Sequence, residues 1–291
     1  MRPLPWMKEA MTQVGIHSEI ISMKPISGGE INQAYYVETD KSPIFIKANA
    51  AFGEDFFQSE AEGLMELKER GGVLTPDVFG LFTINEGHLS GCVMEWIESK
   101  QGGSPKLLAE TVAKLHKVTS AQYGYKDRTF VGEIVQQNGW WDNWCEYYQM
   151  MRIQPQMRLA EQLGYMPLIR RRRLEALVGR MNEWIPTDDI TPRLLHGDLW
   201  AGNWMIGKNR LPYLIDPSIL YGHHEFELAY TELFGGFPEE FYDVYQQILP
   251  IDREYKNRKP LYQLFFLLVH LNTFGEKYGS HVDTVLKRYV G

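Results

Sequence analysis

The chain has 291 residues, of which 44% are hydrophobic and 23% charged, and its net charge is −7. This composition excludes a disordered chain, and the length is sufficient for two lobes. Residues 1–96 hold 7 Lys and Arg against 14 Asp and Glu, whereas the remainder holds 23 of each. Because neither part has a basic excess, the charge distribution argues against a nucleic-acid-binding protein.

The apolar segments argue against a membrane protein. The apolar run at residues 264–269 is far shorter than the roughly 20 residues that span a bilayer. Residues 1–9 lack the apolar core of a signal peptide. Cys92 and Cys145 form neither a disulfide framework nor a metal-binding spacing. We therefore expect no membrane partner and a reducing, cytoplasmic location.

The first third of the chain predicts an antiparallel sheet with helices. Short runs rich in β-branched and aromatic residues alternate with turn residues, and two longer runs have helical periodicity. The expected elements are a helix over 4–14, strands near 19–26, 31–39 and 43–48, a helix over 52–70, and strands near 77–84 and 88–95.

Two glycines stand between the first two predicted strands. Paired glycines let backbone amides approach phosphate oxygens, and nearby polar side chains can add donors. The candidate phosphate-binding residues are Ser27, Gly28, Gly29 and Asn32. An ordinary hairpin turn is the alternative interpretation. The pattern is neither the spaced glycines of protein kinases nor a Walker loop.

Lys47 lies in a short β-rich run, as expected of a strand lysine that pairs with ATP phosphates. The helix that follows offers two acidic partners, Glu60 and Glu62. Glu60 shares the apolar face with Phe57 and Leu64, whereas Glu62 lies on the polar face. We therefore expect Glu60 to point inward and meet Lys47, and residues 1–96 to form a nucleotide-binding domain.

The remainder, residues 97–291, predicts a mainly helical catalytic and substrate-binding domain. The character changes after residue 96, and residues 101–105 resemble a linker. A β-rich small lobe, a hinge and a helical large lobe make an α+β, protein-kinase-like two-lobe fold. Helices are expected at 105–119, 139–160, 167–184, 224–234, 238–248, 258–277 and 280–290.

The most aromatic stretch begins near residue 137. On a continuous helix, Trp141, Trp144, Cys145 and Tyr148 would share one face, which indicates core packing. Asn138 and Trp140 precede that face and are candidates to touch a substrate. His116 and His270 sit in apolar predicted helices and are interpreted as core or surface residues.

The stretch His196-Gly197-Asp198-Leu199-Trp200-Ala201-Gly202-Asn203 carries the strongest chemical signal. In phosphoryl transfer from ATP, one Asp accepts the proton of the substrate hydroxyl, while an Asn and a second Asp hold magnesium over the phosphates. Asp198 and Asn203 keep the five-residue step of a kinase catalytic loop, and Asp216 follows an apolar strand-like run thirteen residues later. Asn203 and Asp216 supply the hard oxygen ligands that Mg²⁺ prefers.

Two further polar groups follow Asp216. His223 and Glu225 could hold a substrate hydroxyl, or they could serve as local structural hydrogen-bond partners. The basic run at residues 170–173 lies in a predicted helix and is interpreted as a solvated helix face.

Together these motifs resemble the fructosamine/ketosamine-3-kinase family, in the aminoglycoside-phosphotransferase-like branch of the kinase fold. The resemblance covers nearly the whole chain, and the Asp-Leu-Trp-x-Gly-Asn form of the loop is more specific than His-Gly-Asp alone. The motifs that carry it are Ser27-Gly28-Gly29-Glu30-Ile31-Asn32, Phe45-Ile46-Lys47, Glu60-Ala61-Glu62-Gly63-Leu64, Met94-Glu95-Trp96, the loop from His196 to Asn203, Asp216-Pro217-Ser218 and Tyr221-Gly222-His223-His224-Glu225-Phe226-Glu227-Leu228-Ala229.

The resemblance implies ATP- and Mg²⁺-dependent phosphorylation of the 3-hydroxyl of a ketosamine, free or protein-bound, which promotes deglycation. Asp198 would be the proton acceptor, Asn203 and Asp216 the metal ligands, and Lys47 with Glu60 the phosphate clamp. The hinge Glu95-Trp96-Ile97 would offer backbone groups to adenine. The family's usual acidic residue before Leu-Ala is Asp, and Glu227 departs mildly from it.

Three alternatives differ in class. A protein kinase needs a long activation segment, yet only eight residues separate Asp216 from Glu225. A kinase of another small alcohol or amino sugar, such as an aminoglycoside, choline or homoserine, would keep the same catalytic residues. A non-catalytic nucleotide-binding pseudokinase would be favoured if a core residue were missing, and none is.

Overall fold

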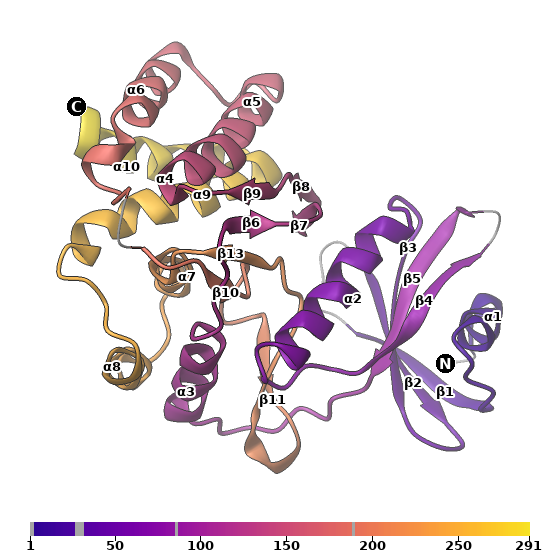
Figure 1. Ribbon diagram of the computed structural model, residues 1–291. Helices are drawn as coiled ribbons and strands as arrows, with labels where there is room; N and C mark the ends of the chain where they lie inside the picture. The colour runs from indigo at the N-terminus through magenta and orange to yellow at the C-terminus, as the bar shows by residue number, and fades with distance from the viewer. Residues whose placement is uncertain (1–2, 27–31, 85–86, 188–189) are drawn as a thin grey trace. The chain divides into compact units, whose positions relative to one another are not determined.

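A computed structural model describes residues 3–26, 32–84, 87–187 and 190–291 of the chain (Figure 1). The chain folds into two compact units. The first comprises Met1–Ser104 and Trp204–Ser218, and the second comprises Pro105–Asn203 and Ile219–Gly291. The units therefore change near residue 104 rather than residue 96, and a short later segment returns to the first unit. No helix in the described ranges is long and apolar enough to cross a membrane.

The first unit is built on a five-stranded sheet. Its strand order is β1-β2-β3-β5-β4, and every neighbouring pair is antiparallel. All five strands were predicted, with ends that differ by one or two residues. They are β1 (Ile20–Ile26), β2 (Gln33–Thr39), β3 (Ile44–Asn49), β4 (Val78–Ile84) and β5 (Leu89–Glu95).

Helices α1 (Pro5–Gln13) and α2 (Glu54–Glu69) cover opposite sides of this sheet (Figure 1). Successive side chains of a strand point to opposite faces. Ile46 of β3 accordingly lies in the core that contains Met7 and Met11 of α1. Its neighbour Lys47 faces α2, whose Glu60 it contacts. The alternation along one strand thus separates the hydrophobic core from the polar site.

A hairpin of β11 (Trp204–Ile206) and β12 (Pro212–Leu214) completes the first unit. The Leu214 amide donates to the Leu74 carbonyl at 2.9 Å, and the Lys100 amide donates to the Ile206 carbonyl at 2.8 Å. These bonds join the hairpin to the segment before β4 and to the segment after β5. They fix the position of Asp216, which follows β12.

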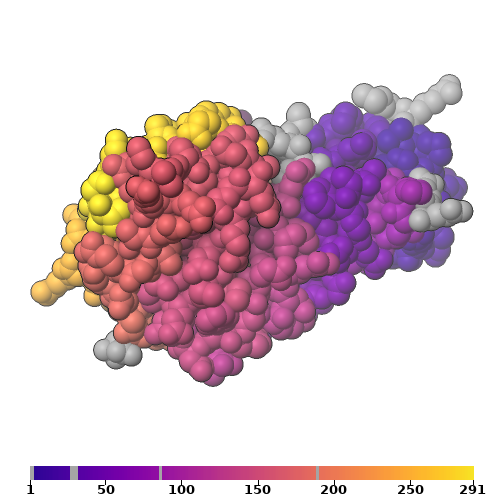
Figure 2. All heavy atoms as spheres, turned by 90° about the horizontal axis from the view of Figure 1, so that it is seen from above, coloured from indigo at the N-terminus to yellow at the C-terminus, as the bar shows by residue number. Residues whose placement is uncertain are grey.

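The second unit is mainly helical. Helix α9 runs through it and contacts α5, α7 and α10, while α3 packs on α8. Figure 2 shows the C-terminal residues, in yellow, beside the red segment that contains α6, in agreement with the packing of α10 on α6. The helices are α3 (Pro105–Leu115), α4 (Trp144–Tyr147), α5 (Gln154–Gln162), α6 (Leu168–Gly179), α7 (His224–Thr231), α8 (Glu239–Ile248), α9 (Tyr255–Phe274) and α10 (Gly279–Val290).

Short strands interrupt these helices. A four-stranded sheet has the order β10-β13-β6-β9, and β7 and β8 form a separate hairpin. The pairing of β10 with β13 joins the strand that leads into the loop from His196 to Asn203 with the strand that follows Asp216. The strands are β6 (Tyr123–Tyr125), β7 (Thr129–Val131), β8 (Ile134–Gln136), β9 (Gly139–Trp141), β10 (Arg193–Leu195) and β13 (Leu220–Gly222).

The helix predicted over 139–160 is wrong in its first part. Gly139 has φ 135°, which lies outside the helical region, and it begins strand β9. Helix α4 begins only at Trp144, where the side chain of Asn143 accepts the Glu146 amide at 2.9 Å and caps the helix. Trp141 is therefore not on the helical face of Trp144, although Trp144, Cys145 and Tyr148 are buried as expected.

The rest of this predicted helix is not uniform. A π-helical turn over Tyr148–Ile153 separates α4 from α5. Its Arg152 is only 2% exposed and donates to the Gln137 carbonyl and to Asn138 Oδ1. The guanidinium also lies over the Tyr147 ring, 4.9 Å from its centroid. Arg152 thus attaches the wide turn to the loop that precedes β9.

Candidate active site

In the first unit, Lys47 is held by two carboxylates. Its Nζ lies 2.7 Å from Glu60 Oε1 and also donates to Asp216 Oδ1. The expected pairing of Lys47 with Glu60 is therefore present. Glu62, two residues further along α2, is half-exposed and accepts a hydrogen bond from Gln58 at 2.8 Å.

Burial and charge set the protonation of this cluster. Burial by itself lowers the pKa of Lys47, but Asp216 and Glu60 outweigh it and hold the pKa above its ordinary value. Burial raises the pKa of Glu60 to about 7, against the opposing effect of Lys47. Lys47 is thus a charged ammonium group, and its contacts with Glu60 and Asp216 fix the position of its Nζ. A charged donor of this kind can form strong hydrogen bonds with phosphate oxygens.

Asp216 has an unusual backbone conformation. Its φ is 55°, in the left-handed region that residues other than glycine rarely adopt. Asp216 lies two residues after β12, the last strand of the β11–β12 hairpin. Such strained residues cluster at functional sites. The Asp216 side chain is 43% exposed, so its carboxylate remains accessible although one oxygen contacts Lys47.

The predicted hinge follows β5. Glu95 is the last residue paired with β3, and its amide donates to the Asp77 carbonyl at 2.8 Å. The Trp96 ring contacts Tyr36 with centroids 4.8 Å apart, and Ile97 is buried. The strand pairing thus ends at Glu95, at the beginning of the segment expected to offer backbone groups to adenine.

The predicted phosphate loop is described only at its end. Ser27, Gly28 and Gly29 lie outside the described residues, as do Glu30 and Ile31. Asn32 accepts a hydrogen bond from Asn49 Nδ2 at 3.0 Å. This bond ties the end of the loop to the end of β3, two residues beyond Lys47.

In the second unit, Asn203 turns back onto Asp198. Its Nδ2 donates to the Asp198 backbone carbonyl at 2.7 Å and to Asp198 Oδ2 at 2.9 Å. Both partners are acceptors, so the amide must face them with its nitrogen. The side-chain oxygen of Asn203 is therefore directed away from Asp198.

Glu227 of α7 holds the beginning of the catalytic loop. Its Oε1 accepts the Gly197 amide at 2.6 Å, and its Oε2 accepts the His196 amide at 3.2 Å. His116 Nε2 lies 2.7 Å from the same Oε2, and His116 Nδ1 lies 2.7 Å from the Tyr245 hydroxyl. Burial favours the neutral acid, but His116 and the loop amides outweigh it and lower the pKa of Glu227. The carboxylate is thus a charged anchor for the loop.

Two aromatic residues near Asp198, Tyr230 and Trp200, were not predicted as site residues from the sequence. Burial and then the nearby Asp198 carboxylate raise the pKa of Tyr230 well above its usual value. Trp200 is 41% exposed, and its ring lies so close over Gly202 that a Cβ at that glycine would come within 2.4 Å of it. The spacing from Asp198 to Trp200 could have indicated the second residue. Tyr230 could be found only from the packing of α7.

The four predicted substrate residues differ in their positions. Trp140 is 44% exposed and lies beside Tyr125 and Tyr221. Asn138 is occupied within the protein, since its Oδ1 accepts from Tyr147 and Arg152 and its Nδ2 donates to the Asp127 carbonyl. Trp140 is therefore the better placed of the two to contact a substrate.

His223 and Glu225 are both buried. His223 Nδ1 lies 2.8 Å from the Tyr262 hydroxyl. Glu225 is 0% exposed and pairs with Arg258 at 2.9 Å, while its Oε1 also accepts the Asp252 amide. This geometry favours the structural alternative for Glu225, which joins α7 to α9.

The model of the fructosamine kinase family matches residues 6–291. The chain belongs to the fructosamine kinase family. It is 38% identical over 265 residues to a "Probable ketoamine kinase" of Enterococcus faecium, covering 91% of this chain and 94% of that protein. It is 31% identical over 287 residues to the chloroplastic "Protein-ribulosamine 3-kinase" of Arabidopsis thaliana, covering 97% and 87%.

Solved structures show the same fold. A candidate fructosamine-3-kinase from Haemophilus somnus 129PT matches with a TM-score of 0.87 and 24% identity, over 97% of each chain. An aminoglycoside phosphotransferase solved with AMP-PNP and hygromycin B matches with a TM-score of 0.66 and 12% identity, over 99% of this chain and 100% of that chain. The predicted α+β, kinase-like fold class and the family resemblance are thereby confirmed.

Proposed function

We propose that this fructosamine kinase family member transfers the γ-phosphoryl group of ATP to the 3-hydroxyl of a ketosamine. The observation that carries the proposal is that hydrogen bonds and ion pairs hold the charged groups of the site in fixed positions. Lys47 is a fixed ammonium between Glu60 and Asp216, and Asn203 orients Asp198 in a loop anchored by Glu227. Phosphoryl transfer needs this positioning of charge more than it needs covalent chemistry.

In the proposed reaction, each residue has one task. Lys47 pairs with phosphate oxygens, and the hinge from Glu95 to Ile97 receives adenine. Asp198 orients the acceptor hydroxyl and takes its proton as the oxygen–phosphorus bond forms. The bond between the γ-phosphorus and the bridging oxygen breaks, ADP leaves with the electron pair, and the products are a phosphoketosamine, ADP and a proton.

Mg²⁺ fits the oxygen donors that these residues offer. Asn203 presents its amide oxygen because its nitrogen is engaged with Asp198, and Asp216 keeps an accessible carboxylate. A pair of oxygen ligands that leaves room for phosphate oxygens and waters suits magnesium. When bound, Mg²⁺ would neutralise charge on the phosphates.

The substrate assignment rests on the family and on exposed aromatic rings. The Arabidopsis relative is named for ribulosamine on protein, and we extend that class, free or protein-bound, to this chain. Trp140 and Trp200 offer exposed rings on which a sugar can stack. A 3-phosphate on the adduct promotes its breakdown, so the proposed role is deglycation. Two buried free thiols are consistent with work in a reducing, cytoplasmic compartment.

Magnesium-dependent ATP turnover tests the proposal. The substrates are ribulosamine and fructosamine of lysine, kanamycin, choline and homoserine, with Asp198→Ala as the blank. Turnover with a ketosamine alone is expected. Turnover with kanamycin or an amino alcohol alone would replace the substrate class but keep the catalytic residues. ATP binding without any turnover would favour the pseudokinase.

A further inference from the structure

We propose that Tyr230 of α7 is a positioning residue for Asp198, because its hydroxyl holds the carboxylate of the catalytic loop in one direction. The inference rests on the proposed function, in which Asp198 accepts the proton of the sugar hydroxyl. It adds a second donor to the one that Asn203 supplies. All three residues belong to the second unit.

Helix α7 brings Tyr230 to the catalytic loop. Glu227 of this helix accepts the Gly197 amide at 2.6 Å, and Gly197 directly precedes Asp198. Tyr230 follows Glu227 by three residues, so the two side chains are neighbours on one helical face. Tyr230 is only 4% exposed, and its side chain is hydrogen-bonded to that of Asp198. One face of α7 therefore holds both the beginning of the loop and its carboxylate.

Two aromatic rings hold the Tyr230 ring in place. Phe266 of α9 stacks on it with centroids 3.7 Å apart and an angle of 3° between the ring planes. Phe234 meets it edge-on, with centroids 6.3 Å apart. Carbon atoms at the separation of the Phe266 stack are in van der Waals contact, so the Tyr230 ring cannot tilt without losing that contact. The hydroxyl is therefore presented at a fixed position.

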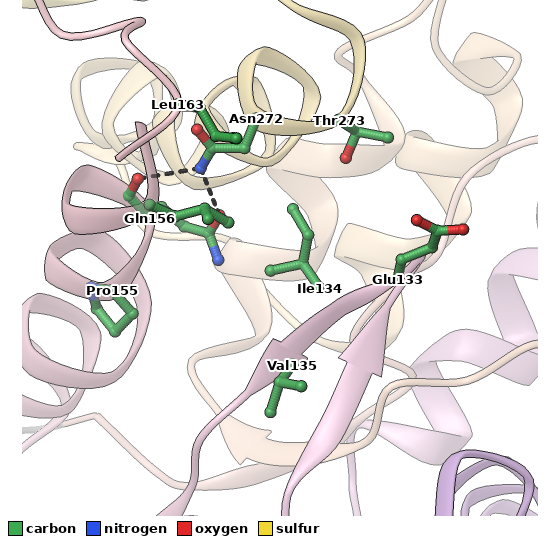
Figure 3. Close-up of a pocket in the computed structure, with 9 residues that line it drawn as sticks. Glu133, Ile134, Val135, Pro155, Gln156, Leu163, Asn272 and Thr273 are labelled. Carbon is green, nitrogen blue, oxygen red and sulfur yellow. Dashed lines mark hydrogen bonds between the residues drawn. The ribbon is translucent and has the colours of Figure 1, made fainter. Parts of the chain in front are cut away.

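Helix α9, which carries Phe266, is itself fastened near its C-terminal end. Asn272 donates through Nδ2 to the Gln156 backbone carbonyl at 3.0 Å and to Gln156 Oε1 at 2.9 Å. Figure 3 shows these bonds between α9 and α5 as dashed lines. The helix on which Tyr230 stacks is thus held by a second helix.

The protonation of Tyr230 determines the direction of its hydrogen bond. Burial, and then the Asp198 carboxylate, raise the pKa of Tyr230 well above its usual value, with a smaller effect of Tyr278. The phenol therefore keeps its proton, and an ionised carboxylate can only accept. Tyr230 is the donor and Asp198 the acceptor.

Asp198 thus accepts from two side chains. Asn203 Nδ2 donates to Asp198 Oδ2 at 2.9 Å, and Tyr230 adds its hydroxyl. His196 contacts the same residue through the backbone, since the Asp198 amide donates to His196 Nδ1 at 3.3 Å. A carboxylate has about four acceptor positions, so lone pairs remain for the substrate hydroxyl. Hydrogen bonds to a carboxylate favour its ionised form, which is the form that accepts a proton.

Two phenylalanine variants test this role by kinetics. Tyr230→Phe removes the hydroxyl and keeps the ring that stacks on Phe266. With ribulosyl-lysine blocked at both ends as substrate, kcat should fall about tenfold, and KM for ATP should stay within about twofold. The acid limb of the kcat profile should move to higher pH, because one donor to the carboxylate is lost.

Tyr148→Phe is the matched control. Tyr148 is also buried in the second unit, and its hydroxyl donates to the Leu261 carbonyl at 2.6 Å. This variant loses a buried hydroxyl of the same kind but no donor to Asp198. Its kcat and its pH profile should match those of wild type.

Spectroscopy tests the hydrogen bond without turnover. In protein labelled with ¹³C at tyrosine Cζ, the Tyr230 resonance is the one that Tyr230→Phe removes. Asp198→Asn should shift this resonance and leave that of Tyr148 in place, because only Tyr230 loses a carboxylate acceptor. An unmoved Tyr230 resonance would overturn the proposal, and so would a kcat that Tyr230→Phe lowers no more than Tyr148→Phe. A shifted resonance in a protein that turns over no ketosamine would keep the hydrogen bond and overturn the proposed function instead.

Discussion

The Lys47 ammonium lies between the carboxylates of Glu60 and Asp216, and each carboxylate has a different task. Asp216 is accessible and, in the proposed function, would be released toward a metal, whereas Glu60 is buried at the α2 side of the sheet. Glu60 therefore keeps the ammonium in place when Asp216 is engaged elsewhere. Helical periodicity was sufficient to choose Glu60 over Glu62, because only one face of α2 can be apolar.

Replacing Glu60 by Gln should impair nucleotide use. The neutral amide leaves Lys47 to pair with Asp216 alone, which competes with metal binding. We expect kcat/KM for ATP to fall roughly 10- to 100-fold, or about 1.4–2.7 kcal/mol of transition-state stabilisation. Steady-state kinetics with varied ATP measures it. Glu62→Gln on the same helix is the control and should stay within about twofold; a similar loss in both variants would contradict the assignment.

Glu227 anchors the catalytic loop through three donors, two backbone amides and His116. In Glu227→Gln, the amide nitrogen must face at least one of these donors, and a buried N–H is left unpaired. We expect a loss of about 1–3 kcal/mol in the free energy of unfolding and a lower kcat. Glu227→Asp keeps the charge and should retain more of both. Urea unfolding and kcat give the two readouts, and undiminished kcat in Glu227→Gln would refute the anchoring role.

At the scale of helices and strands, periodicity predicted the first unit well. Apolar and polar residues alternate along its strands, and α2 has one apolar face. Each pattern therefore fits only one type of secondary structure. The strands from Tyr123 to Trp141 were missed because each has only three residues, and because glycines with positive φ lie within β6 and β9 and between β7 and β8. The site was predictable where residues share a local motif, such as Asp198 with Asn203. It was not predictable where the contacting residue, such as Glu227 or Tyr230, comes from α7, which is distant in the sequence.

Strands β6 and β9 approach each other so closely that residue 124 has no room for a side chain. A Cβ added there would lie 1.9 Å from the Gly139 carbonyl oxygen, and φ is 102°. Gly124→Ala must separate the two strands, so we expect a loss of about 3 kcal/mol or more in the free energy of unfolding. Gly164→Ala has a comparable φ of 79° but nothing within 4 Å, so it isolates the backbone strain. Its loss should be about 1 kcal/mol. Equal losses in urea unfolding would contradict the contact.

At the scale of the whole molecule, acid stability depends on buried histidines of the second unit. Burial, with smaller effects of His116, Arg193 and Arg258, lowers the pKa of His224 from 6.5 to about 3. Burial also lowers the pKa of His223. The unfolded chain therefore binds protons below pH 6.5 that the folded chain does not. Stability should fall as the pH falls from 6.5 toward 3, by about 1.4 kcal/mol per pH unit for each such histidine.

His224→Gln tests this linkage. The variant removes one titrating group, so the slope of unfolding free energy against pH should decrease by about one proton. The window from pH 6.5 to 5 is the most informative, because most carboxylates titrate below it. Urea unfolding at four pH values in this window measures the slope. An unchanged slope would mean that His224 is not held neutral in the folded protein.

The position of the new phosphate tests the central claim most directly. Wild type, ATP, Mg²⁺ and blocked ribulosyl-lysine are incubated, and the product is analysed by ³¹P–¹H correlation NMR, with Asp198→Ala in parallel. We expect one phosphomonoester, coupled to the proton on carbon 3, and almost none with the variant. A phosphate on another oxygen, or undiminished product with Asp198→Ala, would contradict the account.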